Sequence, residues 1–353
     1  MAEALSGAAD LRGPALESRE PMHFAALDLG TNNCRLLIAT ATVRGFRIVD
    51  AYSRIVRLGE GLGRSGRLSE AAMERALAAL AVCADKIRRR QPVRVRAIAT
   101  QACRTAANGV EFLARVAERT GLALDVISAR EEAQLAVAGC WNLVDRRADA
   151  ALVLDVGGGS TELSWLDLRG GHGGARQATR AWVSVPIGVV TLAERFPEEE
   201  GADPAWFRRM VEAVRTPIAA FVGAEALRPL FARRQAHLIG TSGAITSLAG
   251  LHLGLERYER AKVDGLWMTR EDCELVARRL AALTARERAA QPCIGPDRAD
   301  LVLAGAAILE AVQEVWPCER VRVADRGLRE GVLLSMMSAR RRGSGRRGAG
   351  GTP

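Results

Sequence analysis

The sequence predicts an α/β protein made of two similar halves. Residues 24–37 (FAALDLGTNNCRLL) and 151–165 (ALVLDVGGGSTELSW) share one plan: an apolar strand reaches an Asp, passes through a glycine turn and returns as a second apolar strand. After each hairpin, apolar runs of strand length alternate with stretches of helical periodicity. A chain of 353 residues with 48% hydrophobic content is long enough for two domains with separate cores.

The second hairpin carries the plainest chemical pattern. Asp155 ends its first strand, and Gly157, Gly158 and Gly159 are followed by Ser160. Three residues without a Cβ let phosphate oxygens approach the backbone N–H groups, and Ser160 adds a hydroxyl donor. Asp155 is then placed to hold a divalent cation or a water beside the phosphates. The alternative is a plain hairpin whose glycines serve geometry alone and whose Asp caps the turn.

The first hairpin repeats this plan with Asp28, Gly30, Thr31, Asn32 and Asn33. Two such turns in one chain predict two half-domains that face each other and meet phosphates from both sides of a cleft. In this respect the sequence resembles the acetate kinase/hexokinase/actin superfamily. Each of the two lobes in that superfamily opens with such a phosphate hairpin.

Composition excludes several classes of protein. No run approaches the roughly 18 apolar residues that cross a bilayer, and the start of the chain lacks the apolar core of a signal peptide. The seven cysteines are scattered and show no Cys-x-x-Cys spacing, which favours free thiols over disulfides or a zinc site. We therefore expect a soluble, cytoplasmic protein with no membrane partner.

The net charge of +9 and the pI of about 9.8 give weak support for a polyanionic substrate. The basic residues are almost all Arg, with Lys only at positions 86 and 262, a bias that GC-rich coding explains without nucleic acid as a partner. Part of the charge lies in residues 339–353, which we expect to be a disordered basic tail. Residues 1–21 are expected to be a flexible leader.

Residues 54–66 (RIVRLGEGLGRSG) contain Gly61, Gly63 and Gly66 in the spacing of a dinucleotide fingerprint. That fingerprint opens a helix directly within a parallel βαβ unit. Here Ser69 is the expected helix N-cap, and the preceding strands, including one at 46–52, form a meander. A mobile loop bordering the cleft is the favoured interpretation.

In the rest of the first half, stretches with the hydrophobic period of a helix alternate with stretches typical of a strand. We expect helices at 69–90, 109–120 and 129–144, with Asn108 capping the second, and strands at 93–100 and 122–128. Thr100, Gln101 and Arg104 follow a strand end, the usual position of ligand groups in an α/β sheet. Arg104 can fork onto a phosphate. The alternative is a surface Arg paired with a neighbouring acid.

Glu131 and Glu132 are adjacent in the first turn of the helix predicted at 129–144. Adjacent helical residues are about 100° apart, so the two carboxylates cannot point the same way. One is expected to face solvent near the helix N-terminus, and the other to lean over the strand ends into the cleft. The alternative is that both are ordinary first-turn acids.

The second half continues the alternation. Residues 236–250 (AHLIGTSGAITSLAG) predict a strand, a turn at Thr241, Ser242 and Gly243, and a helix whose N-terminus is an anion site. The alternation indicates two ribonuclease-H-like lobes, at 22–146 and 147–325, followed by a closing helix at 326–338. The other elements expected here are a strand at 180–185, a turn at 186–188, helices at 189–196, 204–222, 269–289 and 298–316, and a strand at 320–324.

Five segments in order make the resemblance specific. DLGTNNCRLL, ATQACRTAAN, ISAREEAQLAVAGC, LDVGGGSTEL and VADRGLREGVL resemble successive signatures of the exopolyphosphatase/guanosine pentaphosphate phosphatase (Ppx/GppA) family, over residues 24–338. Three departures affect loop geometry: Ala129 stands where the family has Gly, the first turn is Gly-Thr-Asn-Asn, and the last motif reads Asp325-Arg326-Gly327. The acids of these segments, Asp28, Glu132, Asp155 and Glu162, are all present.

The resemblance implies a Mg²⁺-dependent hydrolysis of terminal phosphoanhydride bonds. Glu132 would be the general base, Asp28 and Asp155 would hold Mg²⁺ directly or through water, and Glu162 would help. Arg104 and three turns would hold the phosphates. The first hairpin turn would contribute Gly30, Thr31, Asn32 and Asn33, the second Gly157, Gly158, Gly159 and Ser160, and the third turn Thr241, Ser242 and Gly243.

The leading substrate is inorganic polyphosphate, cleaved from its end, because aromatic residues make up only 4% of the chain and a guanine platform is not evident. The alternative is the 5′ phosphate of guanosine pentaphosphate (pppGpp). A superfamily kinase or ATPase and a non-catalytic sensor are further alternatives. We also expect a homodimer through the apolar surface of 298–316, with core packing as the alternative.

Overall fold

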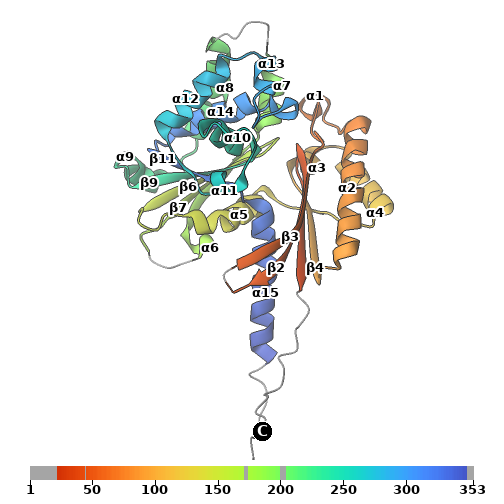
Figure 1. Cartoon of the computed structure of the whole chain (residues 1–353). Helices are drawn as coiled ribbons and strands as arrows, with labels where there is room; N and C mark the ends of the chain where they lie inside the picture. Colours follow the sequence, from red (N-terminus) through yellow and green to blue (C-terminus); the bar gives the residue numbers. More distant parts are fainter. Residues whose placement is uncertain (1–21, 44, 171–173, 199–203, 348–353) are drawn as a thin grey trace, which may run out of the picture.

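The computed structural model describes residues 22–43, 45–170, 174–198 and 204–347. The leader predicted at 1–21 lies outside these ranges. Two mixed sheets form the centres of two lobes (Figure 1). A cavity lies between the lobes. The α/β prediction with two lobes is therefore confirmed.

The sheet of the first lobe has the strand order β3-β2-β1-β4-β5. The first three strands form an antiparallel meander, and β4 and β5 extend the sheet in parallel from β1. Residues of β1 are almost fully buried because the sheet is covered on both faces. The strands are β1 (His23–Leu29), β2 (Asn33–Thr42), β3 (Gly45–Ile55), β4 (Arg94–Ala99) and β5 (Asp125–Val126).

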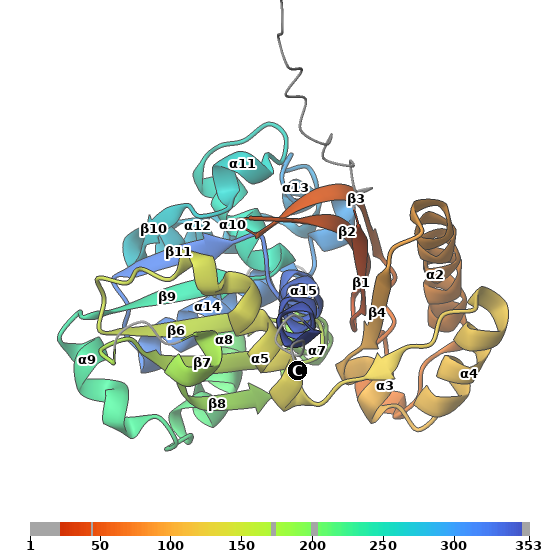
Figure 2. The ribbon, with the colours of Figure 1, turned by 90° about the horizontal axis from the view of Figure 1, so that it is seen from below.

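Helices α2 and α4 cover one face of this sheet, on the right in Figure 2. Ser69 caps α2 as predicted, accepting a hydrogen bond from the Ala72 N–H at 3.2 Å. Asn108 stands at the start of α4, but its side chain binds the backbone of Leu68 instead of the helix, so the predicted cap is wrong in its bonding. The helices of this part are α1 (Leu62–Ser65), α2 (Glu70–Arg90), α3 (Gln101–Thr105), α4 (Gly109–Thr120), α5 (Ala129–Cys140) and the 3₁₀ turn η1 (Trp141–Leu143).

The sheet of the second lobe has the order β10-β11-β9-β6-β7-β8. It repeats the first: a meander of β6, β7 and β8 is extended in parallel by β9 and then β11. The repeat inferred from the two hairpins is thus a repeat of topology. The antiparallel edge strand β10 was not predicted. The strands are β6 (Ala150–Val156), β7 (Thr161–Asp167), β8 (Thr179–Val185), β9 (Ala236–Thr241), β10 (Trp267–Thr269) and β11 (Arg320–Ala324).

The helix predicted at 269–289 is two helices. Thr284 accepts from the Glu287 N–H and the Glu287 carboxylate accepts from the Thr284 N–H at 2.8 Å, so a capping box starts a new helix. The helices of the second lobe are α6 (Ala175–Ala178), α7 (Val189–Arg195), α8 (Pro204–Ala219), η2 (Glu225–Leu227), α9 (Arg228–Ala232), α10 (Gly243–His252), α11 (Arg260–Val263), α12 (Arg270–Ala281), α13 (Ala285–Ala289), η3 (Pro296–Arg298) and α14 (Val302–Val315).

The largest core lies between this sheet and helices α8, α10, α12 and α14. Nearly every residue of α14 is buried there, so the apolar surface expected to form a dimer is core, as the alternative proposed. Trp316 stacks edge-on against Trp165 at 5.2 Å within it. The seven cysteines are all buried and free, as predicted.

Helices α5 and α15 (Leu328–Arg347) fill the space between the two sheets (Figure 2). They touch backbone to backbone, because a Cβ on Gly139 would lie 1.9 Å from the Gly327 carbonyl oxygen and one on Gly331 2.0 Å from the Leu135 carbonyl oxygen. The final helix therefore returns to pack on β1 and β2 of the first lobe. The predicted lobes at 22–146 and 147–325 followed each other along the chain, and that division did not include the return of α15 to the first lobe.

Helix α15 also corrects the prediction for the end of the chain. The closing helix was expected to stop at 338 and a disordered tail to follow, but α15 continues to Arg347. Arg is a good helix former, and a glycine inside a helix costs only about 1 kcal/mol, so the Arg-rich segment extends the helix. Residues 348–353 lie outside the described part. No helix within the described ranges has the length and apolarity needed to span a membrane.

Candidate active site

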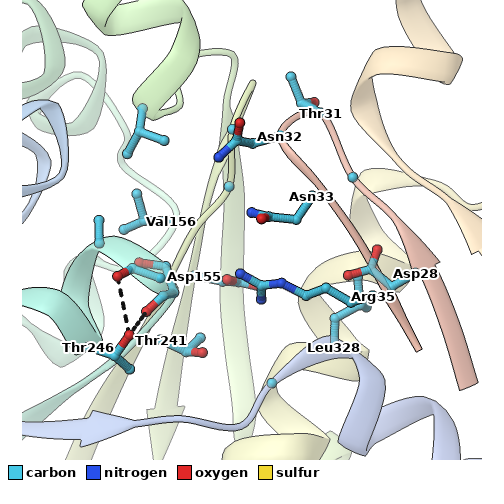
Figure 3. A pocket seen from close by; sticks show the side chains of 18 of the residues that line it. Asp28, Thr31, Asn32, Asn33, Arg35, Asp155, Val156, Thr241, Thr246 and Leu328 are labelled. Carbon is cyan, nitrogen blue, oxygen red and sulfur yellow. Dashed lines mark hydrogen bonds between the residues drawn. The ribbon is translucent and has the colours of Figure 1, made fainter. Parts of the chain in front are cut away.

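A cavity of about 400 Å³ lies between the lobes. Both hairpin turns, the turn between β9 and α10, and the segment between β11 and α15 contribute to its wall (Figure 3). Most of the predicted site residues line it, whereas Arg104 and Glu162 do not. The predicted residues in the wall are Asp28, Gly30, Thr31, Asn32, Asn33, Glu132, Asp155, Gly157, Gly158, Gly159, Ser160, Thr241, Ser242 and Gly243.

The turns offer backbone donors to an anion. In each hairpin one bond closes the turn, from the Gly30 N–H to the Asn33 oxygen and from the Gly157 N–H to the Ser160 oxygen. Within the described ranges, no protein group accepts from the N–H groups of Gly158 and Gly159. The first N–H groups of α10 have no intrahelical partner either, because they belong to a helix N-terminus. These donors suit phosphate oxygens.

The two hairpin turns approach each other closely. A Cβ on Gly158 would lie 3.0 Å from the Thr31 Cβ, and one on Gly159 would lie 2.0 Å from the Gln101 Oε1. The Thr31 hydroxyl donates to that same Gln101 oxygen at 3.2 Å. The glycines of the second turn are therefore required for contact between the lobes as well as for access to the backbone.

Asp28 and Asp155 stand at matching positions of the two sheets and are half-buried. Burial raises the pKa of Asp28, and the charge of Arg35 opposes that shift. Burial, followed by the charges of Glu162 and Asp28, raises the pKa of Asp155 to about 8. A cation near these acids would keep both ionised at neutral pH.

Glu132 and Glu131 lie on different faces of α5, as predicted from their spacing. Glu132 is buried and lines the cavity, while Glu131 is half-exposed and pairs with Arg96 at 2.5 Å. Burial raises the pKa of Glu132, the charge of Glu162 raises it further, and Arg104 opposes the shift. At a pKa of about 9 the carboxyl is mostly protonated at neutral pH, so it can act as a base only where nearby positive charge favours its ionised form.

Arg104 contacts an acid instead of lining the cavity. Its Nη1 donates to the Ile127 carbonyl oxygen at 2.7 Å and to the Glu132 Oε2 at 3.2 Å. It belongs to the short helix α3, which directly follows the end of β4. In this structure Arg104 therefore orients Glu132.

Glu162 lies behind the glycine turn. Its Oε1 accepts hydrogen bonds from the hydroxyls of Ser160 at 2.8 Å and Ser184 at 2.7 Å. The Ser160 proton is thus engaged with Glu162, although the sequence analysis assigned that hydroxyl to phosphate. Burial is the main cause that raises the pKa of Glu162.

Sequence reasoning missed most of the cationic side chains of the cavity. Arg35 on β2 lies opposite Asp28 on β1 in the strand register. Figure 3 shows the Arg35 side chain extending from its strand toward Asp155, in the wall of the cavity. A charged residue inside the apolar run NCRLL was the available signal, but a chain rich in Arg hides it. Tyr258 also lines the wall, so an aromatic group is present after all. The other missed cations are Arg260, Arg298, Arg326 and Arg329.

The acids fit a lightly coordinated Mg²⁺ better than a closed metal cage. Among the described residues, no group of three or more His, Cys, Asp or Glu side chains converges on a metal position. Asp28 Oδ1 is buried and has no hydrogen-bond partner in the described structure. Mg²⁺ commonly keeps several waters and takes only one or two protein carboxylates plus substrate phosphates.

The fold and the cavity define a two-lobed α/β protein with a cavity between its lobes that both hairpin turns and several arginines line. The profile of the Ppx/GppA phosphatase family matches residues 37–340, and the chain belongs to this family. Exopolyphosphatase 2 of Mycobacterium tuberculosis is 31% identical over 328 residues, which cover 88% of this chain and 98% of that protein.

Solved structures agree with this assignment. The Aquifex aeolicus member of the Ppx/GppA family is 28% identical with a TM-score of 0.73. An exopolyphosphatase from Cytophaga hutchinsonii is 26% identical with a TM-score of 0.77. Each comparison covers 90% of this chain and 98% of the other. The protein is thus similar to exopolyphosphatases over most of its length.

Proposed function

We propose that this phosphatase removes orthophosphate from the end of inorganic polyphosphate, with Mg²⁺ as cofactor. The observation that carries the proposal is one cavity that holds two phosphate-type turns, a helix N-terminus and a buried carboxyl. The names of the relatives in Mycobacterium tuberculosis and Cytophaga hutchinsonii support polyphosphate as the substrate class.

Glu132 is the proposed general base. It lines the cavity, Arg104 fixes its carboxylate, and in its ionised form, which positive charge in the cavity favours, it would accept the proton of an attacking water. A positioned base contributes roughly 10²–10⁴-fold to such reactions. In phosphoryl transfer, charge in the transition state lies largely on the equatorial oxygens of the transferred group. The N–H groups of the turns and Arg35 are the fixed donors available to those oxygens.

Asp28 and Asp155 are the residues that would hold Mg²⁺, through one or two carboxylates and water. When bound, Mg²⁺ neutralises phosphate charge and favours the ionised form of both acids. Glu162 does not line the cavity, so in this proposal it supports the glycine turn through Ser160 instead of binding the metal directly.

Polyphosphate is favoured because arginines outside the turns also line the cavity. Arg260, Arg298 and Arg329 line the wall contributed by the second lobe and α15. A single terminal phosphate does not need so many cations, whereas a repeating anion can contact them in series.

The second candidate substrate is pppGpp, and Tyr258 is the observation in its favour. The sequence argument against a guanine platform relied on the scarcity of aromatic residues, yet Tyr258 and Arg298 both line the cavity. An aromatic ring and a guanidinium plane are the groups that stack on a base. Polyphosphate remains our primary proposal because the cavity offers more cations than base-reading groups.

The test is orthophosphate release by the purified protein with Mg²⁺, measured on long-chain polyphosphate, pppGpp and ATP. The proposal expects polyphosphate to be the best substrate, with release abolished by a chelator. Release from ATP alone would indicate an ATPase or kinase. No release from any of the three would favour a non-catalytic sensor.

A further inference from the structure

The glycine segment 54–66 belongs to the first lobe and contacts the second lobe. It was expected to be a mobile loop, but it contains the short helix α1 and lies beside α7 of the second lobe (Figure 1). The Gly61 N–H donates to the Glu194 Oε1 of α7 at 2.8 Å. Gly61 and Gly66 adopt left-handed backbone with φ of 72° and 67°, so these two glycines have a structural explanation that involves no nucleotide.

The backbone of this segment supports the first phosphate turn. The N–H groups of Val56 and Arg57 both donate to the Asn32 carbonyl oxygen, at 2.9 and 3.0 Å, and the Gly59 N–H donates to the Thr31 oxygen at 2.9 Å. Arg57 adopts a left-handed backbone with φ of 46°, which is unfavourable for a residue with a Cβ. The fold keeps this strained residue directly behind a turn that lines the cavity.

The side chain of Arg57 reaches the other lobe. Its two terminal nitrogens bind the two carboxylate oxygens of Asp300 at 2.8 and 3.0 Å, and Nη2 also donates to the Asp297 carbonyl oxygen at 3.2 Å. Asp300 stands between Arg298 and Leu301, which both line the cavity. A single residue therefore links the backbone of one cavity wall to the opposite wall.

We propose that Arg57 is a positioning residue that holds the lobes closed around the cavity by its forked contact with Asp300. We call Arg57, Gly61, Glu194 and Asp300 the interlobe clasp. The proposal rests on the proposed function, since a closed cavity aligns the donors of both lobes on one terminal phosphate. The Arg57 and Asp300 side chains are 32% and 48% exposed. Such pairs are weak compared with the stability of a whole fold but can shift the balance between two arrangements of the lobes several-fold, so loss of the clasp should alter lobe closure and leave the fold intact.

The direct test is the distance between the lobes. Because the native cysteines are all buried, spin labels can be directed to Val110→Cys on α4 and Leu275→Cys on α12, two positions that are 84% and 61% exposed. Arg57→Ala in this background should broaden the measured distance distribution and shift it to longer values. Arg208→Ala is the matched control, because Arg208 makes an exposed ion pair with Glu310 and Glu314 inside the second lobe. An unchanged distribution in Arg57→Ala would overturn the proposal.

A kinetic test uses charge reversal. Arg57→Asp and Asp300→Arg should each lower kcat/KM for polyphosphate about tenfold, mainly through KM, with little change in Tm. The double variant should recover most of that loss, because the ion pair re-forms with its charges exchanged. A double variant no better than the single ones contradicts the clasp. The distance measurement requires no turnover, so failure of the clasp and failure of the proposed function are distinguishable.

Discussion

Asp28 and Asp155 occupy equivalent positions in the two sheets, but the residue opposite Asp28 is a cation and the residue opposite Asp155 is an acid. Asp28 pairs with Arg35 across β1 and β2, whereas Asp155 pairs with Glu162 across β6 and β7. The repeat is therefore symmetric in backbone and asymmetric in charge. The first hairpin provides a cation to the cavity, and the second provides an acid that supports its own turn.

Glu132 should act as the general base. Glu132→Gln should lower kcat about 10²-fold or more with little effect on folding, because an amide can position a water but cannot take its proton. Glu131→Gln is the control, since Glu131 pairs with Arg96 on the outer face of the same helix. The measurement is the steady-state rate of phosphate release. Greater damage from Glu131→Gln would show that the wrong acid was chosen.

Arg104 should act through Glu132. Arg104→Met removes a charge that holds down the pKa of Glu132, so ionisation of the base will require a higher pH. We expect about a tenfold loss of rate at neutral pH and a shift of the pH–rate profile toward alkaline pH. Arg96→Met, beside Glu131, should leave the profile in place. A uniform loss at every pH would mean that Arg104 does not tune this carboxyl.

The metal requirement should depend on Asp155. Asp155→Asn should raise the Mg²⁺ concentration for half-maximal rate by about tenfold or more, because a hard cation prefers a charged oxygen ligand. The control is Asp167→Asn, a change in an acid that pairs with Arg169 away from the cavity. A Mg²⁺ titration of both variants gives the result. Full activity of the unmodified protein in chelator would refute the metal role.

His237 should make stability depend on pH. Burial lowers its pKa to about 4, while the unfolded side chain titrates near pH 6.5, so protonation favours the unfolded state. Its contribution is complete above pH 6.5 and is lost as the pH falls toward 4, by about 2 kcal/mol at pH 5. Urea unfolding of His237→Gln should show a smaller loss between pH about 7.5 and about 5 than the unmodified protein. Equal losses in the two proteins would contradict this account.

Local patterns in the sequence were sufficient for the hairpins and for the two faces of Glu131 and Glu132. Strand periodicity, glycine turns and helical spacing are properties of neighbouring residues, so they can be read without the fold. Five motifs in order then identified the family. These features account for most of the wall of the cavity.

Contacts between distant segments could not be predicted in this way. The forked bond of Arg57 to Asp300 and the return of α15 to the first sheet join opposite ends of the chain. Arg35 and Arg329 were missed because Arg is so frequent here that composition gives no contrast. Arg104 was assigned to phosphate because its acidic partner, Glu132, lies on another helix.

The central claim is that the cavity acts on a long anionic chain, and the ratio of kcat/KM for polyphosphate to that for pppGpp tests it most directly. Measured with Mg²⁺ at low and at moderate ionic strength, this ratio should exceed one and should fall as salt rises, because a chain with several charge contacts is more sensitive to screening than a nucleotide. A ratio below one, or a KM for polyphosphate that does not change with salt, would contradict the claim and make pppGpp the substrate.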